Sequence, residues 1–272
     1  RGEVVLTALG DGERILLPWE VSRIANGPGQ SLSEPAFARK IRQAEEEEFT
    51  QRRLAQAGVL YLECIEQAES PAQQAYARLL RARVLAKLEQ TDDYLAESHK
   101  VLAVSPEITD EHGVPLCLYA AGRLLNQGDS YDEVVQLIAS ELGARRWLSP
   151  AESYMVRDLA DALVRSGVAP GIGRRRADAY QQEIRERIRR LEQAFALQED
   201  FPPALEARLK NPEQATEAVW VPFGEEPWLV SLAAPLPGRP LLVIVVRASD
   251  TFDSIIAKAS YSERLLENVR LP

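Results

Sequence analysis

The sequence predicts a mainly α-helical protein of stacked antiparallel helix hairpins, with a small C-terminal α/β module. Apolar residues recur at helical spacing through the middle of the chain, and short β-rich runs occur near both ends. The 272 residues include 46% apolar and 27% charged residues, a balance that allows a sizeable core without disulfide or metal staples. We expect a strand pair and linker at 1–33, a helical-repeat domain at 34–205 and the α/β module at 206–272.

The N-terminal region carries two short apolar runs, residues 3–6 and 14–17, on either side of the turn Gly10-Asp11-Gly12. This arrangement predicts two strands joined by a tight turn. Residues 26–29 then break regular structure, and Ser33-Glu34-Pro35 offers a cap followed by an early helical proline. The helical region therefore begins here.

From Ala36 to about Ala103, the only breaks are Ser70-Pro71 and Gln90-Thr91-Asp92, which predicts helices of about 16 to 18 residues. Short turns between such helices make neighbours antiparallel. A further helix pair is expected from Gly113 to about Leu142. Its break is at residues 126–129, and another helix follows over about 151–164.

The last third of the chain changes character twice. Residues 167–173 form a Pro/Gly loop, and residues 174–198 follow as one long, strongly charged helix with Arg and Glu at i,i+4 spacing, typical of a solvated face. Three strands are then expected, followed by a final helix capped by Ser249. The N-terminal strand pair can join these strands in one sheet. The three predicted strands are 219–221, 228–232 and 241–246.

The central helices resemble tetratricopeptide repeats. The motif Leu118-x3-Gly122-x2-Leu125-x2-Gly128-x2-Tyr131 places a small residue where two helices approach and a tyrosine in the turn. A second unit departs from the pattern, because Leu85 stands where the small residue is expected. The resemblance covers about residues 49–164. It implies a concave groove that binds peptides or another protein.

The order of parts is also similar to the extracytoplasmic input regions of some bacterial sensor histidine kinases. Repeat-like helices come first and include the segments 70–75 and 113–120. The predicted strands at 227–232 and 242–248 follow. This resemblance implies a periplasmic ligand- or protein-sensing input domain in bacterial signal transduction, with no kinase residue in this part. The start at Arg1, without a signal-peptide core, favours a piece of a longer chain. The alternative is a cytoplasmic tetratricopeptide-like protein-interaction scaffold.

Residues that could carry chemistry are sparse, so the chain is not expected to be an enzyme. The net charge of −9 disfavours nucleic acid as a partner. His99 and His112 lack metal-ligand spacing and a serine-protease context, so neither a metal nor a cofactor is predicted. The four acids at 45–48 are interpreted as a solvated helix face. Cys64 and Cys117 are interpreted as two buried thiols, with a single bridge left open.

Two groups of residues are candidates for ligand binding. Trp220, Phe223 and Trp228 could form an aromatic wall, although the packing of a small sheet is the simpler interpretation. Arg174 and Arg175 begin the charged helix and could hold an anionic group, against the alternative of an interdomain hinge. The expected partners are a protein, a peptide or a small signal molecule. A membrane would be reached only through segments outside this sequence, and a homodimer is left open.

Overall fold

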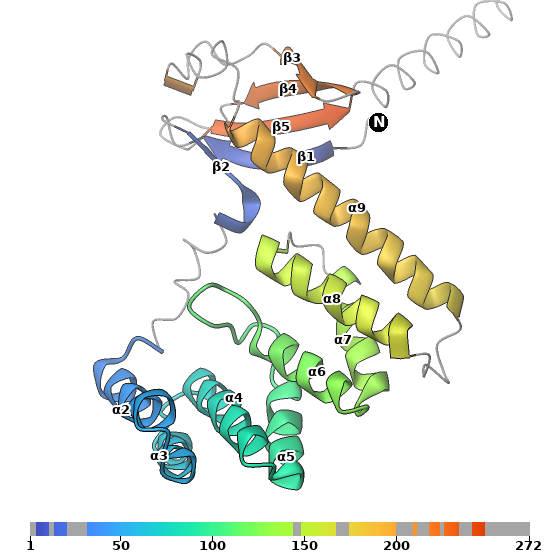
Figure 1. Cartoon of the computed structure of the whole chain (residues 1–272). Helices are drawn as coiled ribbons and strands as arrows, with labels where there is room; N and C mark the ends of the chain where they lie inside the picture. The colour runs from blue at the N-terminus through green and yellow to red at the C-terminus, as the bar shows by residue number, and fades with distance from the viewer. Residues whose placement is uncertain are drawn as a thin grey trace, which may run out of the picture. The chain divides into compact units, whose positions relative to one another are not determined.

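The computed structural model describes residues 4–10, 14–20, 32–143, 148–166, 174–199, 209–210, 218–223, 226–233 and 241–247. Contacts divide the chain into two compact units. One, called here the sheet unit, comprises Arg1–Ser22 and Arg189–Pro272. The other, the helical unit, comprises Arg23–Ile188. The described part is mainly helical, with one small antiparallel sheet (Figure 1).

The helical unit begins with consecutive helices that match most of the expected ones. Breaks fall at Ser70-Pro71 and at Gln90, as predicted, and again at residues 127–130. The α9 helix begins in this unit and continues into the sheet unit. The helices are α2 (Pro35–Glu45), η1 (Glu46–Thr50), α3 (Leu54–Glu66), α4 (Pro71–Lys87), α5 (Thr91–Leu102), α6 (Leu116–Asn126), α7 (Tyr131–Gly143), α8 (Pro150–Ser166) and α9 (Arg174–Glu199).

Local chemistry explains where α4 starts and where α4 and α6 end. The Ser70 hydroxyl accepts a hydrogen bond from the Gln73 amide at 3.1 Å, and Pro71 takes the first helical position, where no amide hydrogen is needed. At the other ends, Glu89 after α4 and Gly128 after α6 adopt φ values of +60° and +77°. Left-handed residues at these positions close helices by turning the chain back toward its last carbonyl groups.

One break was missed by the sequence prediction. Between α2 and α3 the helix widens into a π-helical turn, η1, and then ends at residues 51–53, where Arg52 has a φ of +56°. Neither glycine nor proline marks this place, so the expected single helix is two. A π-helical turn contains one more residue than an α-helical turn, and such turns are frequent at functional sites. Here the extra residue changes which side chains of the acidic run 45–48 face the interior.

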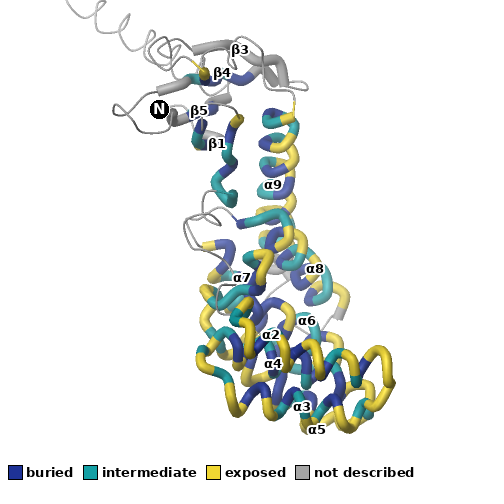
Figure 2. The backbone as a smooth tube through the Cα atoms, turned by 90° about the vertical axis from the view of Figure 1, so that its left-hand side faces the viewer, coloured by how far each residue is buried: buried dark blue, intermediate teal, exposed yellow. Residues whose placement is uncertain are grey.

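Each helix packs on its neighbours through a buried apolar stripe. Contacts join α2 to α3, α3 to α4, α4 to α5 and α5 to α6, and further contacts join α4 to α6 and α6 to α8. Figure 2 shows the buried residues on the sides of the helices that face one another. At Gly122 on α6, an added Cβ would lie 3.7 Å from Leu159 Cδ2 on α8, an ordinary contact distance. These helices are close, but alanine would also fit there.

The sheet unit is built from strands of both chain ends. Its five strands run in the order β2-β1-β5-β4-β3, and every neighbouring pair is antiparallel. The expectation that the two ends meet in one sheet is confirmed, because β1 pairs with β5 from Val4↔Val246 to Gly10↔Leu241. The strands are β1 (Val4–Gly10), β2 (Ile15–Leu16), β3 (Ala218–Phe223), β4 (Glu226–Ala233) and β5 (Leu241–Arg247).

Alternate positions along the central strands are buried. Leu6 and Ala8 of β1, and Val243 and Val245 of β5, are almost fully covered, whereas Thr7 between them is exposed. In the second half of α9, Leu191, Ala194 and Leu197 are buried in turn, as expected of a helix with one apolar side. The Gln198 amide donates to the Ile15 carbonyl at 2.8 Å, which attaches this end of α9 to β2.

Two predicted elements lie outside the described residues, namely the loop at 167–173 and the final helix capped by Ser249. The predicted ion pairing along α9 is seen at Arg187 and Glu183, which are 3.0 Å apart at i,i+4 spacing. Cys64 and Cys117 are both buried and do not form a disulfide. Among the helices that the structure describes, none combines the length and hydropathy needed to cross a bilayer.

Candidate functional site

The residues chosen from the sequence as ligand-binding candidates do not form a described cluster. Trp228 lies on β4 with 1% of its surface exposed, so it is a core side chain of the sheet unit. Trp220 and Phe223 lie on β3, in register with Leu229 and Glu226. Arg174 and Arg175 are the first two residues of α9. The side chains of these last four lie outside the described part of the structure.

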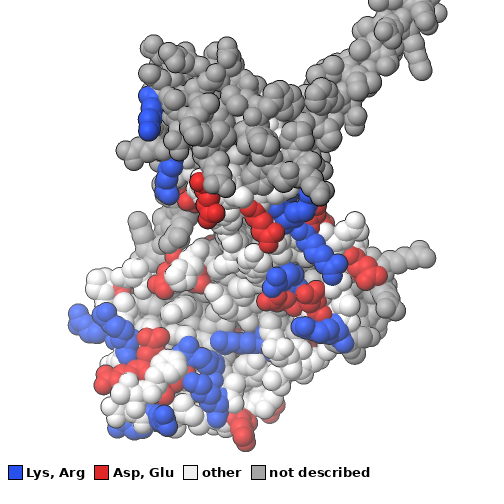
Figure 3. Space-filling view, turned by 45° about the horizontal axis from the view of Figure 1, so that its top comes forward, with Lys and Arg blue, Asp and Glu red and all other residues white. Residues whose placement is uncertain are grey.

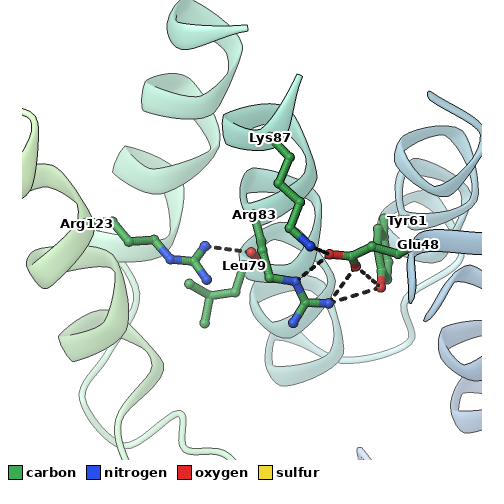
Figure 4. A network of polar contacts seen from close by, with 6 residues as sticks. All are labelled: Glu48, Tyr61, Leu79, Arg83, Lys87 and Arg123. Atoms are coloured by element: carbon green, nitrogen blue, oxygen red, sulfur yellow. Dashed lines mark hydrogen bonds and ion pairs between the residues drawn. The ribbon is translucent and has the colours of Figure 1, made fainter. Parts of the chain in front are cut away.

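The most extensive polar network of the helical unit centres on Glu48 of η1 (Figure 4). The Glu48 carboxylate is fully buried and accepts hydrogen bonds from three residues of α3 and α4. Arg83 holds it with both ends of the guanidinium, Nε to Oε1 at 2.9 Å and Nη2 to Oε2 at 2.7 Å. Lys87 Nζ donates to Oε1 at 2.7 Å, and the Tyr61 hydroxyl donates to Oε2 at 2.9 Å.

The interpretation of residues 45–48 as a solvated face is therefore wrong for Glu48. Burial alone would raise the pKa of this carboxyl, but the hydrogen bonds from Arg83, Lys87 and Tyr61 outweigh it and hold the pKa below its ordinary value. Burial and the neighbouring Glu48 raise the pKa of Tyr61, so this hydroxyl stays protonated and remains a donor. The network is thus ionised and satisfied at neutral pH.

A second arginine lies beside this network on the neighbouring helix. Arg123 of α6 donates from Nη1 to the main-chain carbonyl of Leu79 on α4 at 2.6 Å (Figure 4). Its side chain is half-buried, and burial lowers its pKa. Arg83 lowers the pKa further, while Tyr94 and Glu48 raise it. Among the described residues no carboxylate pairs with Arg123. Arg83 and Lys87 therefore bind the Glu48 carboxylate directly, whereas Arg123 feels it only at longer range.

Two tyrosines extend the same side of α4 and α6. Tyr119 lies one turn before Arg123 on α6 and is exposed, while Tyr76 lies two turns before Arg83 on α4 and is half-buried. The Tyr119 hydroxyl donates to Asp110 Oδ2 at 2.8 Å, which connects α6 to the preceding loop. The α4–α6 face, defined here by Tyr76, Arg83, Tyr119 and Arg123, thus offers two aromatic rings and two guanidinium groups.

A separate cluster joins α4 to α5 around Glu97. This buried carboxylate contacts Arg78 at 2.7 Å, Arg81 at 2.9 Å and Lys100 at 3.1 Å. Burial would raise its pKa, but Arg78 and Lys100 hold the pKa below the ordinary value. Figure 3 shows acidic and basic side chains intermixed on the face that it presents, in keeping with such mixed clusters. The contacts connect two helices that are adjacent in sequence, so the cluster serves the packing of α4 on α5.

His99 takes part in an arrangement that the sequence did not predict. Its Nε2 lies 3.1 Å from Asp129 Oδ2, and its Nδ1 lies 3.3 Å from the hydroxyl of Ser130, which has a φ of +57°. The residue types are those of a serine-hydrolase triad. Ser130 is buried, and its hydroxyl also lies 3.4 Å from Asp129 Oδ1. The cluster fixes α5 to the turn between α6 and α7.

Among the described residues, no three His, Cys, Asp or Glu side chains lie close enough together to bind a metal ion. The His112 ring lies 3.5 Å from the carboxylate of the neighbouring Glu111 on the surface. Compared with known proteins, the chain matches no family model, no curated sequence and no solved structure. Function therefore has to follow from the geometry of the helical unit.

Proposed function

We propose that this chain is a non-catalytic recognition module, whose helices stack as tetratricopeptide-like hairpins and bind a protein or peptide on the α4–α6 face. The contact pattern supports this stacking, because α4, α6 and α8 touch one another in turn while α5 and α7 join them. In such arrays the first helices of successive hairpins form a shared surface that is free to bind partners. No cofactor or metal is part of the proposal.

The proposal rests mainly on Arg123, which has no carboxylate partner among the described residues. A guanidinium has five N–H donors, and where it packs between helices it normally finds a carboxylate or several acceptors. Arg123 has one main-chain carbonyl, and the nearby Arg83 adds repulsion. A half-buried cation with a single hydrogen-bond acceptor has donors left for a partner, so its presence near the exposed ring of Tyr119 favours a binding role.

We propose first that this module is the input domain of a bacterial sensor. A periplasmic input domain needs a surface for a protein or a small signal molecule, and the α4–α6 face offers aromatic and cationic groups to either. A cytoplasmic interaction scaffold is the second use. The sequence on both sides of the chain distinguishes them, since membrane spans followed by a kinase core would support only the first.

Site-specific photocrosslinking tests the binding face directly. A benzoylphenylalanine placed at Tyr119 in the full-length protein, in its native cells, should capture a partner on illumination. The matched position is Ala96, which is exposed on α5. The captured protein, once purified, should bind the chain in solution, and Arg123→Gln should weaken that binding about tenfold or more, as for a lost charge-assisted contact. Capture only at Ala96, or at neither position, would overturn the proposal.

A further inference from the structure

His99 connects two consecutive helix hairpins through both nitrogens of its ring. It lies on α5, the second helix of the α4–α5 hairpin, whereas Asp129 and Ser130 belong to the turn between α6 and α7. His99 Nε2 lies 3.1 Å from Asp129 Oδ2, and Nδ1 lies 3.3 Å from the Ser130 hydroxyl oxygen. These three residues are called here the His99 link. The imidazole is therefore held at both nitrogens by the neighbouring hairpin.

One neutral form of the ring satisfies every contact of the His99 link. The Asp129 carboxylate can only accept hydrogen bonds, so the nitrogen beside it, Nε2, has to carry the ring hydrogen. Nδ1 is then an acceptor, and the Ser130 hydroxyl donates to it. The opposite tautomer would place the lone pair of Nε2 against the carboxylate. The geometry therefore selects the Nε2–H form of the neutral ring.

The same atoms also satisfy the protonated ring, because the Ser130 hydroxyl has a second acceptor. It lies 3.4 Å from Asp129 Oδ1, an oxygen that the Ser130 amide already holds at 2.6 Å. When Nδ1 takes up a proton, it donates to the hydroxyl oxygen, and the hydroxyl hydrogen turns from Nδ1 to Asp129. Protonation thus converts a hydrogen bond between a neutral ring and a carboxylate into an ion pair. Charge-assisted contacts of this kind are stronger than neutral ones.

The other charged groups on the elements around His99 have their own partners or lie on the surface. The cations of α4 and α5 bind the buried carboxylates Glu48 and Glu97, and Arg123 of α6 donates to a main-chain carbonyl of α4. These α4 and α5 cations are Arg78, Arg81, Arg83, Lys87 and Lys100. Exposed acids begin α5 and α7, namely Asp92, Asp93, Asp132 and Glu133. Among the described residues, Asp129 is thus the only charged one in contact with the ring.

We propose that the His99 link responds to pH, and that protonation of His99 strengthens the connection between the α4–α5 and α6–α7 hairpins. The side chain of His99 is 44% exposed, so the ring exchanges protons with solvent in the folded chain. Histidine changes its charge between about pH 5 and 8. An ion pair that needs the charged ring stabilises at low pH, and this stabilisation is lost as the pH rises and the ring is deprotonated. The inference concerns the packing of the hairpins, so it does not depend on the proposed function.

Amide hydrogen exchange of the whole chain, resolved by peptide mass spectrometry, measures the local opening that the link opposes. Wild type and His99→Gln are compared at about pH 8 and about pH 5.5, where the ring is neutral and charged respectively. The ratio of their exchange rates at each pH cancels the intrinsic effect of pH on exchange. Glutamine is uncharged at both values. In peptides covering residues 126–134, the protection of wild type relative to the variant should rise about 1.5- to 5-fold at the lower pH, as expected of a partly exposed ion pair.

Two further variants make the result specific to the His99 link. The rise should disappear when both chains also carry Asp129→Asn, because an amide cannot form the ion pair. His112→Gln replaces the other histidine of the chain, whose ring lies on the surface beside Glu111, and should give the same ratio to wild type at both pH values. A wild-type to His99→Gln ratio that stays constant or falls at the lower pH would overturn the proposal. So would a rise that persists with Asp129→Asn or that His112→Gln reproduces.

Discussion

Replacing the buried Glu48 by glutamine should destabilise the helical unit more than any other single carboxylate substitution near it. The change keeps the shape of the side chain but removes the charge that Arg83 and Lys87 share. Removing one partner of a fully buried ion pair costs about 3 to 5 kcal/mol. Water reaches the exposed parts of Arg83 and Lys87 and solvates them in the variant, which reduces the loss. We therefore expect a loss of about 2 to 3 kcal/mol.

Urea unfolding followed by circular dichroism at 222 nm measures this loss, because most of the helical signal comes from the helical unit. The matched control is Glu47→Gln, one residue earlier. Glu47 pairs with Arg53, a mostly exposed side chain, at 2.6 Å, so about 0.2 to 1 kcal/mol is expected there. In thermal melts the Glu48 variant should unfold about 4 to 12 °C earlier. Equal losses for the two variants would refute the assignment of Glu48 as the centre of the network.

The remaining predictions concern pH and backbone conformation. Because the pKa of Glu48 is lowered by folding, its stabilisation is present above its ordinary value of 4.5 and is lost as pH falls through the lowered value. The stability difference between wild type and Glu48→Gln should therefore shrink toward pH 3 in urea titrations. Glu89→Gly should stabilise by about 0.5 to 1 kcal/mol, and Gly128→Ala should destabilise by about 1 kcal/mol, since both positions have positive φ. Opposite signs would contradict the cap assignment. Gly122→Ala should be neutral or stabilising by up to about 1 kcal/mol in thermal melts, and a large loss would show that α6 and α8 approach more closely.

The helix boundaries that the sequence predicted correctly are those with local chemical signals. Ser70-Pro71 starts α4, and the break at residues 126–129, with Gly128 at positive φ, ends α6. Such signals act through the nearest turn of the backbone, so they can be recognised without the fold. The strands were also found, because β-branched runs between prolines and glycines are distinct from the helical pattern.

The Glu48 network could not be predicted in the same way. Its members come from positions 48, 61, 83 and 87, and only packing of η1 on α3 and α4 brings them together. The available signal was indirect. The acidic run 45–48 exceeds what one solvated helix face needs, and α4 carries Arg83 and Lys87 one turn apart. The π-helical turn that rotates Glu48 inward has no proline or glycine to mark it.

The candidate ligand residues failed for a related reason. Trp228 was chosen because aromatic residues often line binding sites, yet a small sheet needs a large side chain in its core, and Trp228 is buried there. Arg123 was not chosen, although it lies within the repeat-like motif. A lone arginine between apolar residues of a helix indicates a cation packed between helices, and its acceptor, the Leu79 carbonyl, belongs to another helix.

The pairing of β1 with β5 also determines when the sheet unit can form. The helical unit separates β1 from β5 in sequence, so β1 can pair with β2 early but cannot pair with β5 until residues 241–247 have been synthesised. The helical unit, which lies between these strands in sequence, can fold meanwhile. A chain released before residue 241 would retain the helices but leave β1 with a bare edge, and bare edges of this kind promote aggregation.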